Sequence, residues 1–234
     1  MHSLKLLTTI LPLIAATASV TAGPILAQRA DFEDADFIDP RKAGGRMLDA
    51  SAGLGEPLNV IISGKSTPEI LTPEGSKQYF QAIGFVEECL GLHLGSPQTA
   101  NLGDGRGELN ETSVIRERIG GIPILGTCLE SLTGGNHFRV FPQAGTNALF
   151  LATSKEEDLD EHHNIVPNGY DLGRDLLVKA AQGTHHGFDG KNFKFNTYET
   201  EVKMLSGLLE PGTNGINHDI AIDGQVAMLT VRIK

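Results

Sequence analysis

The sequence predicts an α+β fold, in which a mixed or antiparallel sheet is packed by about two helices in a single domain. Short runs of apolar and β-branched residues occur in pairs along the chain, and two amphipathic stretches lie between the pairs. Local strand pairs favour an α+β fold over a doubly wound fold, because doubly wound folds alternate strands with helices. Near the C-terminus, Asp223-Gly224 separates two strand-like runs and predicts a C-terminal β-hairpin.

The individual elements follow from local composition and periodicity. Apolar or alternating runs predict strands around Phe193 and Phe195 and at residues 59–63, 88–94, 137–141, 147–153, 218–222 and 225–233. Residues 76–85 and 170–181 carry apolar side chains at helical spacing, and a glycine lies near the end of each stretch. Residues 95–111 are rich in Gly, Asn and Pro and predict a loop.

The first 22 residues predict a secretory signal peptide. Lys5 precedes an apolar stretch at residues 6–20, and small residues follow up to Ala22. The apolar stretch is shorter than the ~20 residues of a membrane-spanning helix, and Pro12 interrupts it. We therefore expect cleavage after Ala22 and a secreted, extracellular protein without stable membrane insertion.

Residues 23–56 predict a poorly ordered lead-in or propeptide, because they hold scattered charges and glycines but little periodic apolar character. The packed domain is expected over residues 57–234, which are enough for one core. Cleavage removes Lys5, so the 19 basic side chains become 18 against 29 acidic ones. This negative balance disfavours nucleic acid and anionic lipid as partners.

Two further patterns depend on secretion. Cys89 and Cys128 are the two cysteines of the chain, and in an oxidising compartment they predict a disulfide bond, with two buried thiols as the alternative. Asn110-Glu111-Thr112 is an N-glycosylation sequon in a polar, Gly-rich stretch. It predicts a glycosylated surface loop if the host is eukaryotic.

Histidine offers the most versatile chemistry in this chain, which contains eight of them. A neutral imidazole can bind a transition metal or shuttle protons near pH 7. No two histidines show the spacing of a ligand motif such as HExxH, so surface histidines are favoured over a metal site and no cofactor is predicted. The acidic run at residues 156–161 lacks the order of an EF-hand loop, and a solvated turn is favoured over a calcium site.

A second group of charged residues lies at the start of the helix predicted at 170–181. Asp171, Arg174 and Asp175 are close on one helix face. Acidic residues near a helix N-terminus stabilise the helix dipole, which explains the group structurally. In the functional alternative, Asp171 or Asp175 orients the imidazole of His163, which then acts as a base. The chain has no GxSxG nucleophile motif and no P-loop.

Three segments together resemble the domain at the C-terminus of LssY-type proteins. They are PLNVIISG at 57–64 with a helix ending in QAIGF at 81–85, NHFRVF at 136–141, and HNIVPNGYDLGRDLLV at 163–178. The last segment resembles the family pattern His-x-Ile-x-Pro…Asp…Arg-Asp, and the chain is also similar to secreted fungal proteins. The acidic run, the Gly-rich loop and the C-terminal hairpin depart from the family. The resemblance implies that one shared core contains His137, Arg139, His163, Asp171, Arg174 and Asp175.

The first of three functions left open is ligand binding. A small anionic or surface ligand would bind near His137 and His163, with Arg139, Arg174 and Asp175 as its binding residues. Arginine beside histidine suits a phosphate or carboxylate group, because guanidinium can donate two parallel hydrogen bonds to it.

Two alternatives remain beside ligand binding. One is a hydrolase, with or without a metal, in which His137, His163 and Asp171 converge as catalytic residues. The other is an interaction or effector protein without an active site, whose polar residues are structural.

Overall fold

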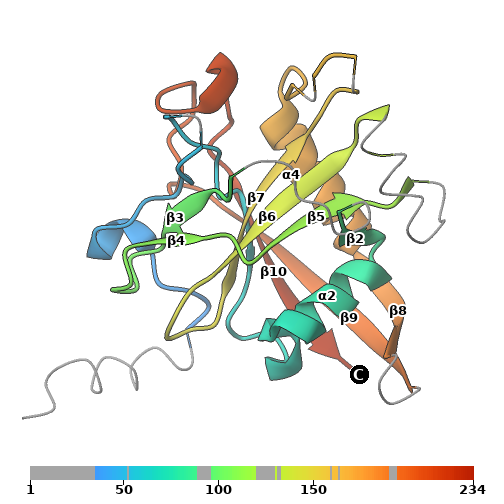
Figure 1. Cartoon of the computed structure of the whole chain (residues 1–234). Helices are drawn as coiled ribbons and strands as arrows, with labels where there is room; N and C mark the ends of the chain where they lie inside the picture. Colours follow the sequence, from blue (N-terminus) through green and yellow to red (C-terminus); the bar gives the residue numbers. More distant parts are fainter. Residues whose placement is uncertain are drawn as a thin grey trace, which may run out of the picture.

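The computed structural model describes residues 35–51, 53–88, 96–119, 130, 133–158, 160–162, 164–189 and 194–234. Within these residues the chain forms two α-helices, an eight-stranded sheet and a two-stranded sheet (Figure 1). The α+β prediction is therefore confirmed in its coarse form, with sheet as the larger part. None of the described helices is long and apolar enough to cross a membrane.

The elements have the following bounds. The helices and short 3-10 turns are η1 (Pro40–Ala43), η2 (Pro68–Leu71), α2 (Pro73–Ala82), α4 (Gly169–Ala181) and η5 (Asn217–Asp219). The strands are β1 (Val60–Ile62), β2 (Phe85–Glu87), β3 (Thr99–Asn101), β4 (Glu108–Asn110), β5 (Ser113–Glu117), β6 (Asn136–Pro142), β7 (Leu149–Lys155), β8 (Gly183–Asp189), β9 (Lys194–Leu205) and β10 (Val226–Ile233).

The large sheet has the strand order β2-β5-β6-β7-β1-β10-β9-β8. Strand β1 lies near its centre, antiparallel to β7 and parallel to β10, and its three residues are buried. The other neighbouring pairs are antiparallel, so the sheet is mixed. A continuous Val-Ile-Ile run suits this position, because a strand covered on both faces has no polar side.

Each face of the sheet packs against its own hydrophobic core. One core joins α2 to the sheet through Phe80, Phe138 and Val60, and the other gathers Phe141 and Tyr170 on the opposite face. Neighbouring strand residues point to opposite faces, so β6 supplies both cores. Figure 1 shows α2 on one side of the sheet and the β3–β4 hairpin on the other.

Helix α4 is fixed closely against the end of β7. A Cβ atom at Gly173 would lie 2.7 Å from the backbone of Ser154, so only glycine allows this approach. The Asn136 side chain donates a hydrogen bond of 2.9 Å to the Gly173 carbonyl, and the Asn59 amide donates one to the Tyr170 carbonyl. These contacts place the start of α4 beside the polar ends of β6 and β7.

Most of the predicted elements are confirmed, with shifted ends. Strands β1, β6, β7 and β10 and helix α4 lie where the sequence predicts them, and β6 and β7 form a hairpin. Helix α2 begins three residues earlier than predicted, because Pro73 occupies its first turn and the Thr72 hydroxyl caps it.

The C-terminal hairpin prediction is wrong. Strand β10 pairs with β9 and β1, whereas residues 217–219 form η5 and Ile222 bridges Gly212. The Asp223 carboxylate accepts two hydrogen bonds from Arg174, so Asp223-Gly224 docks a loop onto α4 instead of turning a hairpin.

Two other segments also differ from the sequence expectations, and a third lies mostly outside the described residues. The predicted loop at 95–111 contains β3 and β4. Of the strand expected at 88–94, Glu88 is not in a strand and residues 89–94 lie outside the described residues. Residues 35–51 and 53–56, within the expected lead-in, include buried Met47 and Asp49. The sequence gives little sign of this packing, because much of it is polar.

Candidate functional site

Arg174 joins α4 to the loop that precedes β10. Its guanidinium binds both carboxylate oxygens of Asp223, at 2.6 and 2.9 Å, and donates to the Gln225 carbonyl at 3.1 Å. Asp175 accepts from its Nε at 2.9 Å, and Asp171 lies 3.4 Å from Nη1. Burial and the charge of Asp223 raise the pKa of Asp171 to about 6. The chain itself therefore supplies the anions that hold Arg174.

Arg139 lies in a different cluster, on the face of β6 that packs against the N-terminal segment. Its Nη1 is 2.9 Å from Oε2 of Glu56 and 3.3 Å from Oδ2 of Asp49. Asp49 also accepts hydrogen bonds from the Ser51 hydroxyl and the Glu56 amide. Burial raises the pKa of Glu56. Two buried carboxylates thus hold the Arg139 charge.

The third cluster, which we call the β5–β7 cluster, centres on Arg116. Its Nη1 lies 2.8 Å from Glu156 and 3.2 Å from Glu130, and its Nε lies 3.4 Å from Glu88. Burial raises the pKa of Glu130 to about 7, and the charge of Glu156 adds to this effect. Carboxyl groups with different proton affinities are thereby held around one arginine.

His137 lies beside this cluster, between a carboxylate and a serine. Its Nδ1 is 3.5 Å from Oε1 of Glu156, and its Nε2 is 3.5 Å from the Ser154 hydroxyl. Sheet register produces this arrangement, because His137 pairs with Arg116 on one side and with Ser154 on the other. Of these residues only His137 was predicted from the sequence, whereas Ser154, Glu130 and Arg116 were not.

The remaining predicted residues divide into two groups. His163, Cys89 and Cys128 lie outside the described residues, so the predicted base and the predicted disulfide remain predictions. Asn110 is exposed at the end of β4. Among the described residues, no group of three or more His, Cys, Asp or Glu side chains is arranged to hold a metal ion.

Two cavities share Thr112 and Pro142 in their linings. The larger, which we call the α2 pocket, has a volume of about 190 Å³ and lies between α2 and strands β5 to β7. Its wall includes Phe80, Ile115 and Val140, and its polar side chains include Lys77, Glu87, Ser76 and Ser113. The Lys77 ammonium is 2.5 Å from the Glu87 carboxylate. The sequence gives no direct sign of this pocket, which depends on how α2 crosses the sheet.

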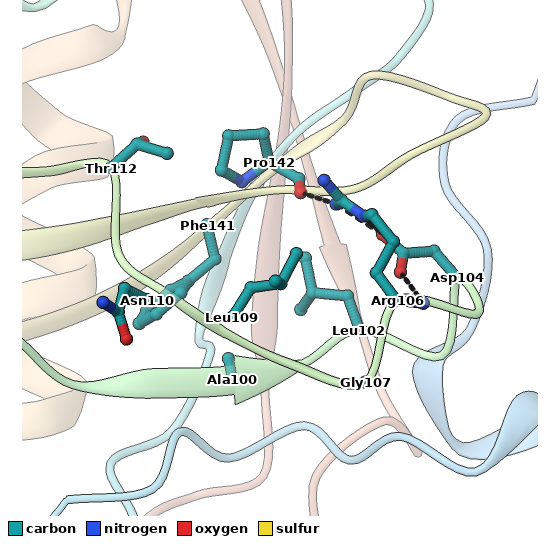
Figure 2. Close-up of a pocket in the computed structure, with 10 residues that line it drawn as sticks. All are labelled: Ala100, Leu102, Asp104, Arg106, Gly107, Leu109, Asn110, Thr112, Phe141 and Pro142. Atoms are coloured by element: carbon teal, nitrogen blue, oxygen red, sulfur yellow. Dashed lines mark hydrogen bonds and ion pairs between the residues drawn. The ribbon is translucent and has the colours of Figure 1, made fainter.

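The smaller cavity, which we call the Asn110 pocket, has a volume of about 70 Å³ (Figure 2). Its apolar lining consists of Ala100, Leu102, Leu109, Phe141 and Pro142. Figure 2 shows Asn110 toward one end of this group and the Arg106–Asp104 ion pair toward the other.

No family model, curated protein or solved structure matches this chain. The resemblance to LssY C-terminal domains therefore remains a prediction. Of the residues that it assigned to one core, the described ones lie in three separate groups of contacts, and His163 lies outside the described residues. Arg139 binds Asp49 and Glu56, Arg174 binds Asp223, and His137 lies beside Glu156.

Proposed function

We propose that the protein is secreted and binds a small ligand with an apolar body and one anionic group in the α2 pocket. The observation that carries this proposal is one cavity that combines an apolar wall with a replaceable lysine ion pair. Binding pockets are commonly concave and mostly apolar, with a few polar groups that orient the ligand. The volume of about 190 Å³ suits a small molecule such as a short-chain carboxylic acid.

Lys77 suits the anionic group better than the arginines that the sequence analysis named. The Lys77 and Glu87 side chains are 36% and 50% exposed. Such a pair contributes about 0–1 kcal/mol, so a ligand carboxylate can replace Glu87 at little cost. Arg139 is held by buried carboxylates, and separating a buried ion pair is strongly unfavourable. Arg174 is itself buried and already binds both carboxylate oxygens of Asp223.

Thermal melts with hexanoate, hexanol and hexylamine test this function. We expect hexanoate to raise the melting temperature most, because it fills the apolar pocket and pairs with Lys77. Lys77→Gln should remove the advantage of hexanoate over hexanol. Lys65→Gln should keep it, since Lys65 is similarly exposed, at 43%, and pairs with Asp36 outside the pocket.

A blocking variant separates pocket binding from surface binding. Ser113→Phe places a bulky side chain in the α2 pocket and should abolish stabilisation by both hexanoate and hexanol. Equal stabilisation of the wild type and Ser113→Phe would reject the pocket as the site, as would a wild type that responds to neither ligand.

Secretion itself rests on residues 1–22, which lie outside the described residues. Expression of the whole chain in a eukaryotic secretory host should release a protein whose N-terminal residue is Gly23. N-terminal sequencing of the secreted protein checks the cleavage, and a protein that stays in the cell with residues 1–22 attached contradicts it.

A serine hydrolase is a second candidate, favoured by the contacts of His137. In Ser-His-acid triads the imidazole Nε2 faces the serine hydroxyl and Nδ1 faces the carboxylate. Ser154, His137 and Glu156 follow this order, and Arg116 holds the second oxygen of Glu156. Distances of 3.5 Å are long for a working triad, but free enzymes often show such looser contacts. Ser154 is buried beneath Gly173, so this candidate requires α4 to move before a substrate can enter.

A fluorophosphonate probe tests the hydrolase directly, because it reacts covalently with activated serines. The candidate predicts labelling of Ser154 and loss of labelling in His137→Gln. Ser63→Ala is the matched control, since Ser63 is also buried and bonds a carboxylate, that of Asp36. A wild-type protein that is not labelled rejects this candidate.

A further inference from the structure

Asn110 belongs to an exposed strand beside an apolar cavity. All three residues of β4 are exposed, and Leu109 is 39% exposed although it lines the Asn110 pocket. The pocket floor is buried, with Leu102 and Phe141 among its residues. The cavity therefore offers apolar surface directly beside a sequon.

The sequon is held at a fixed position relative to this pocket. The amide and the hydroxyl of Thr112 both donate to the Val140 carbonyl, at 2.8 and 3.1 Å. The Glu111 amide donates to the Gln98 carbonyl at 2.9 Å. Asn110 thus lies two residues from an anchored position, and it is among the residues that line the pocket.

We propose that Asn110 carries an N-linked glycan whose first N-acetylglucosamine packs over the Asn110 pocket. In the transfer from a lipid-linked donor, the Asn110 amide nitrogen bonds to the sugar C1. The bond from C1 to the donor diphosphate breaks, and the amide nitrogen loses one proton. The host secretory pathway supplies the donor and the enzyme.

The shape and polarity of the pocket select the first sugar as the occupant. The cavity of about 70 Å³ beside Asn110 has room for the N-acetyl group of the first sugar. The apolar face of the ring then covers Leu109, which removes apolar surface from water. Arg106 donates to Asp104 and to the Pro142 carbonyl, and Figure 2 shows this ion pair away from Asn110.

Two glycosidases applied to the secreted protein test the proposal. Glycopeptide mass spectrometry should find Asn110 occupied. Endoglycosidase H leaves the first sugar in place, whereas peptide N-glycosidase F removes the whole glycan and converts Asn110 to Asp. We expect the one-sugar form to melt about 2 °C above the sugar-free form, a shift typical of a small stabilisation in a domain of this size. An Asn110→Asp protein made without glycosylation controls for the new charge and should melt with the sugar-free form.

A pair of leucine variants shows whether the pocket causes the shift. Leu109→Ser should reduce the difference between the one-sugar and sugar-free forms to near zero. Leu172→Ser should retain it, because Leu172 is equally exposed, at 40%, but lies on α4 away from the pocket. An unmodified Asn110 overturns the proposal, as does an equal melting temperature of the two forms or a shift that survives Leu109→Ser.

Discussion

The Arg174 cluster and the β5–β7 cluster use the same composition in different surroundings. Each places one arginine against three carboxylates: Asp171, Asp175 and Asp223 around Arg174, and Glu88, Glu130 and Glu156 around Arg116. The Asp175 and Asp223 side chains are 62% and 43% exposed, whereas Glu130 is fully buried. Water therefore solvates the excess negative charge of the Arg174 cluster but not that of the β5–β7 cluster.

The difference shows that burial, more than the number of carboxylates, decides which group keeps a proton. The pKa of Asp223 is lowered, because its partial burial is outweighed by the combined effect of its hydrogen bonds with Arg174 and the Gln225 amide and of the Arg174 charge. Burial instead dominates at Glu130 and raises its pKa to about 7. The first cluster fastens a helix to a loop and raises the pKa of one member, Asp171, to about 6, whereas the second raises the pKa of Glu130 to about 7 beside His137.

Loss of the central arginine should have the largest effect, and a larger one in the β5–β7 cluster. Above pH 7, Arg116→Met should lower the free energy of unfolding by about 3 kcal/mol, because Glu130 and Glu156 then face each other without the guanidinium between them. Arg174→Met should cost about 2 kcal/mol, because Asp175 and Asp223 can turn toward water. Urea denaturation with a common slope measures both values.

Arg41→Met provides the reference for these two variants. Arg41 is an exposed arginine that pairs with Asp39, so its loss should cost less than about 1 kcal/mol. A cost for Arg174→Met that equals or exceeds the cost for Arg116→Met would contradict the role assigned to burial.

The next largest effect is a pH dependence that Glu130 introduces. Its pKa is about 7 in the folded protein against 4.5 ordinarily, so only the folded state holds this proton between those values. The stabilisation of the folded state by the Glu130 proton is fully present below pH 4.5 and is lost as the pH rises through 7. Glu130→Gln keeps the neutral form, so it should match the wild type near pH 4.5 and exceed its stability above pH 7.

A second variant separates the two clusters in this pH series. Asp171→Asn should alter the stability profile at lower pH, between the ordinary value of 3.8 and about 6, because burial and Asp223 raise the Asp171 pKa to about 6. Glu210→Gln changes an exposed carboxyl and serves as the control. Urea denaturation at a series of pH values measures the free energy of unfolding of Glu130→Gln, Asp171→Asn and Glu210→Gln. A Glu130→Gln profile parallel to that of the wild type would contradict the proton-holding role of Glu130.

The sequence predicts the parts of the fold that depend on local patterns. The Val-Ile-Ile run of β1, the alternating β6 and the amphipathic α4 are found where their composition places them. The prediction of a C-terminal hairpin fails, because Asp-Gly is only a local turn signal and a distant residue, Arg174, binds the Asp223 side chain.

The candidate site could be predicted only in part, for the same reason. His137 was predicted as a site residue, but its contact with Ser154 was not, because the strands expected at 137–141 and 147–153 would pair His137 with Leu151 instead. The contact of Arg116 with Glu130 and Glu156 could not be predicted from the sequence either, because it joins segments whose spacing is set by the tertiary packing. The α2 pocket likewise depends on how a helix crosses three strands.

The smallest expected effect is that of Asp175→Asn. This variant tests whether an exposed carboxylate contributes less to the stability of its cluster than a buried one. Asp175 binds the same guanidinium as Asp223, at 2.9 Å, but its side chain is mostly in water. An exposed partner of this kind contributes about 0–1 kcal/mol, and salt screens it. Asp175→Asn should therefore change the free energy of unfolding less than Arg174→Met does, and the change should shrink further in high salt. If Asp175→Asn instead cost as much as Arg174→Met, the stability of the cluster would depend on each carboxylate alike, and exposure would not distinguish the two clusters.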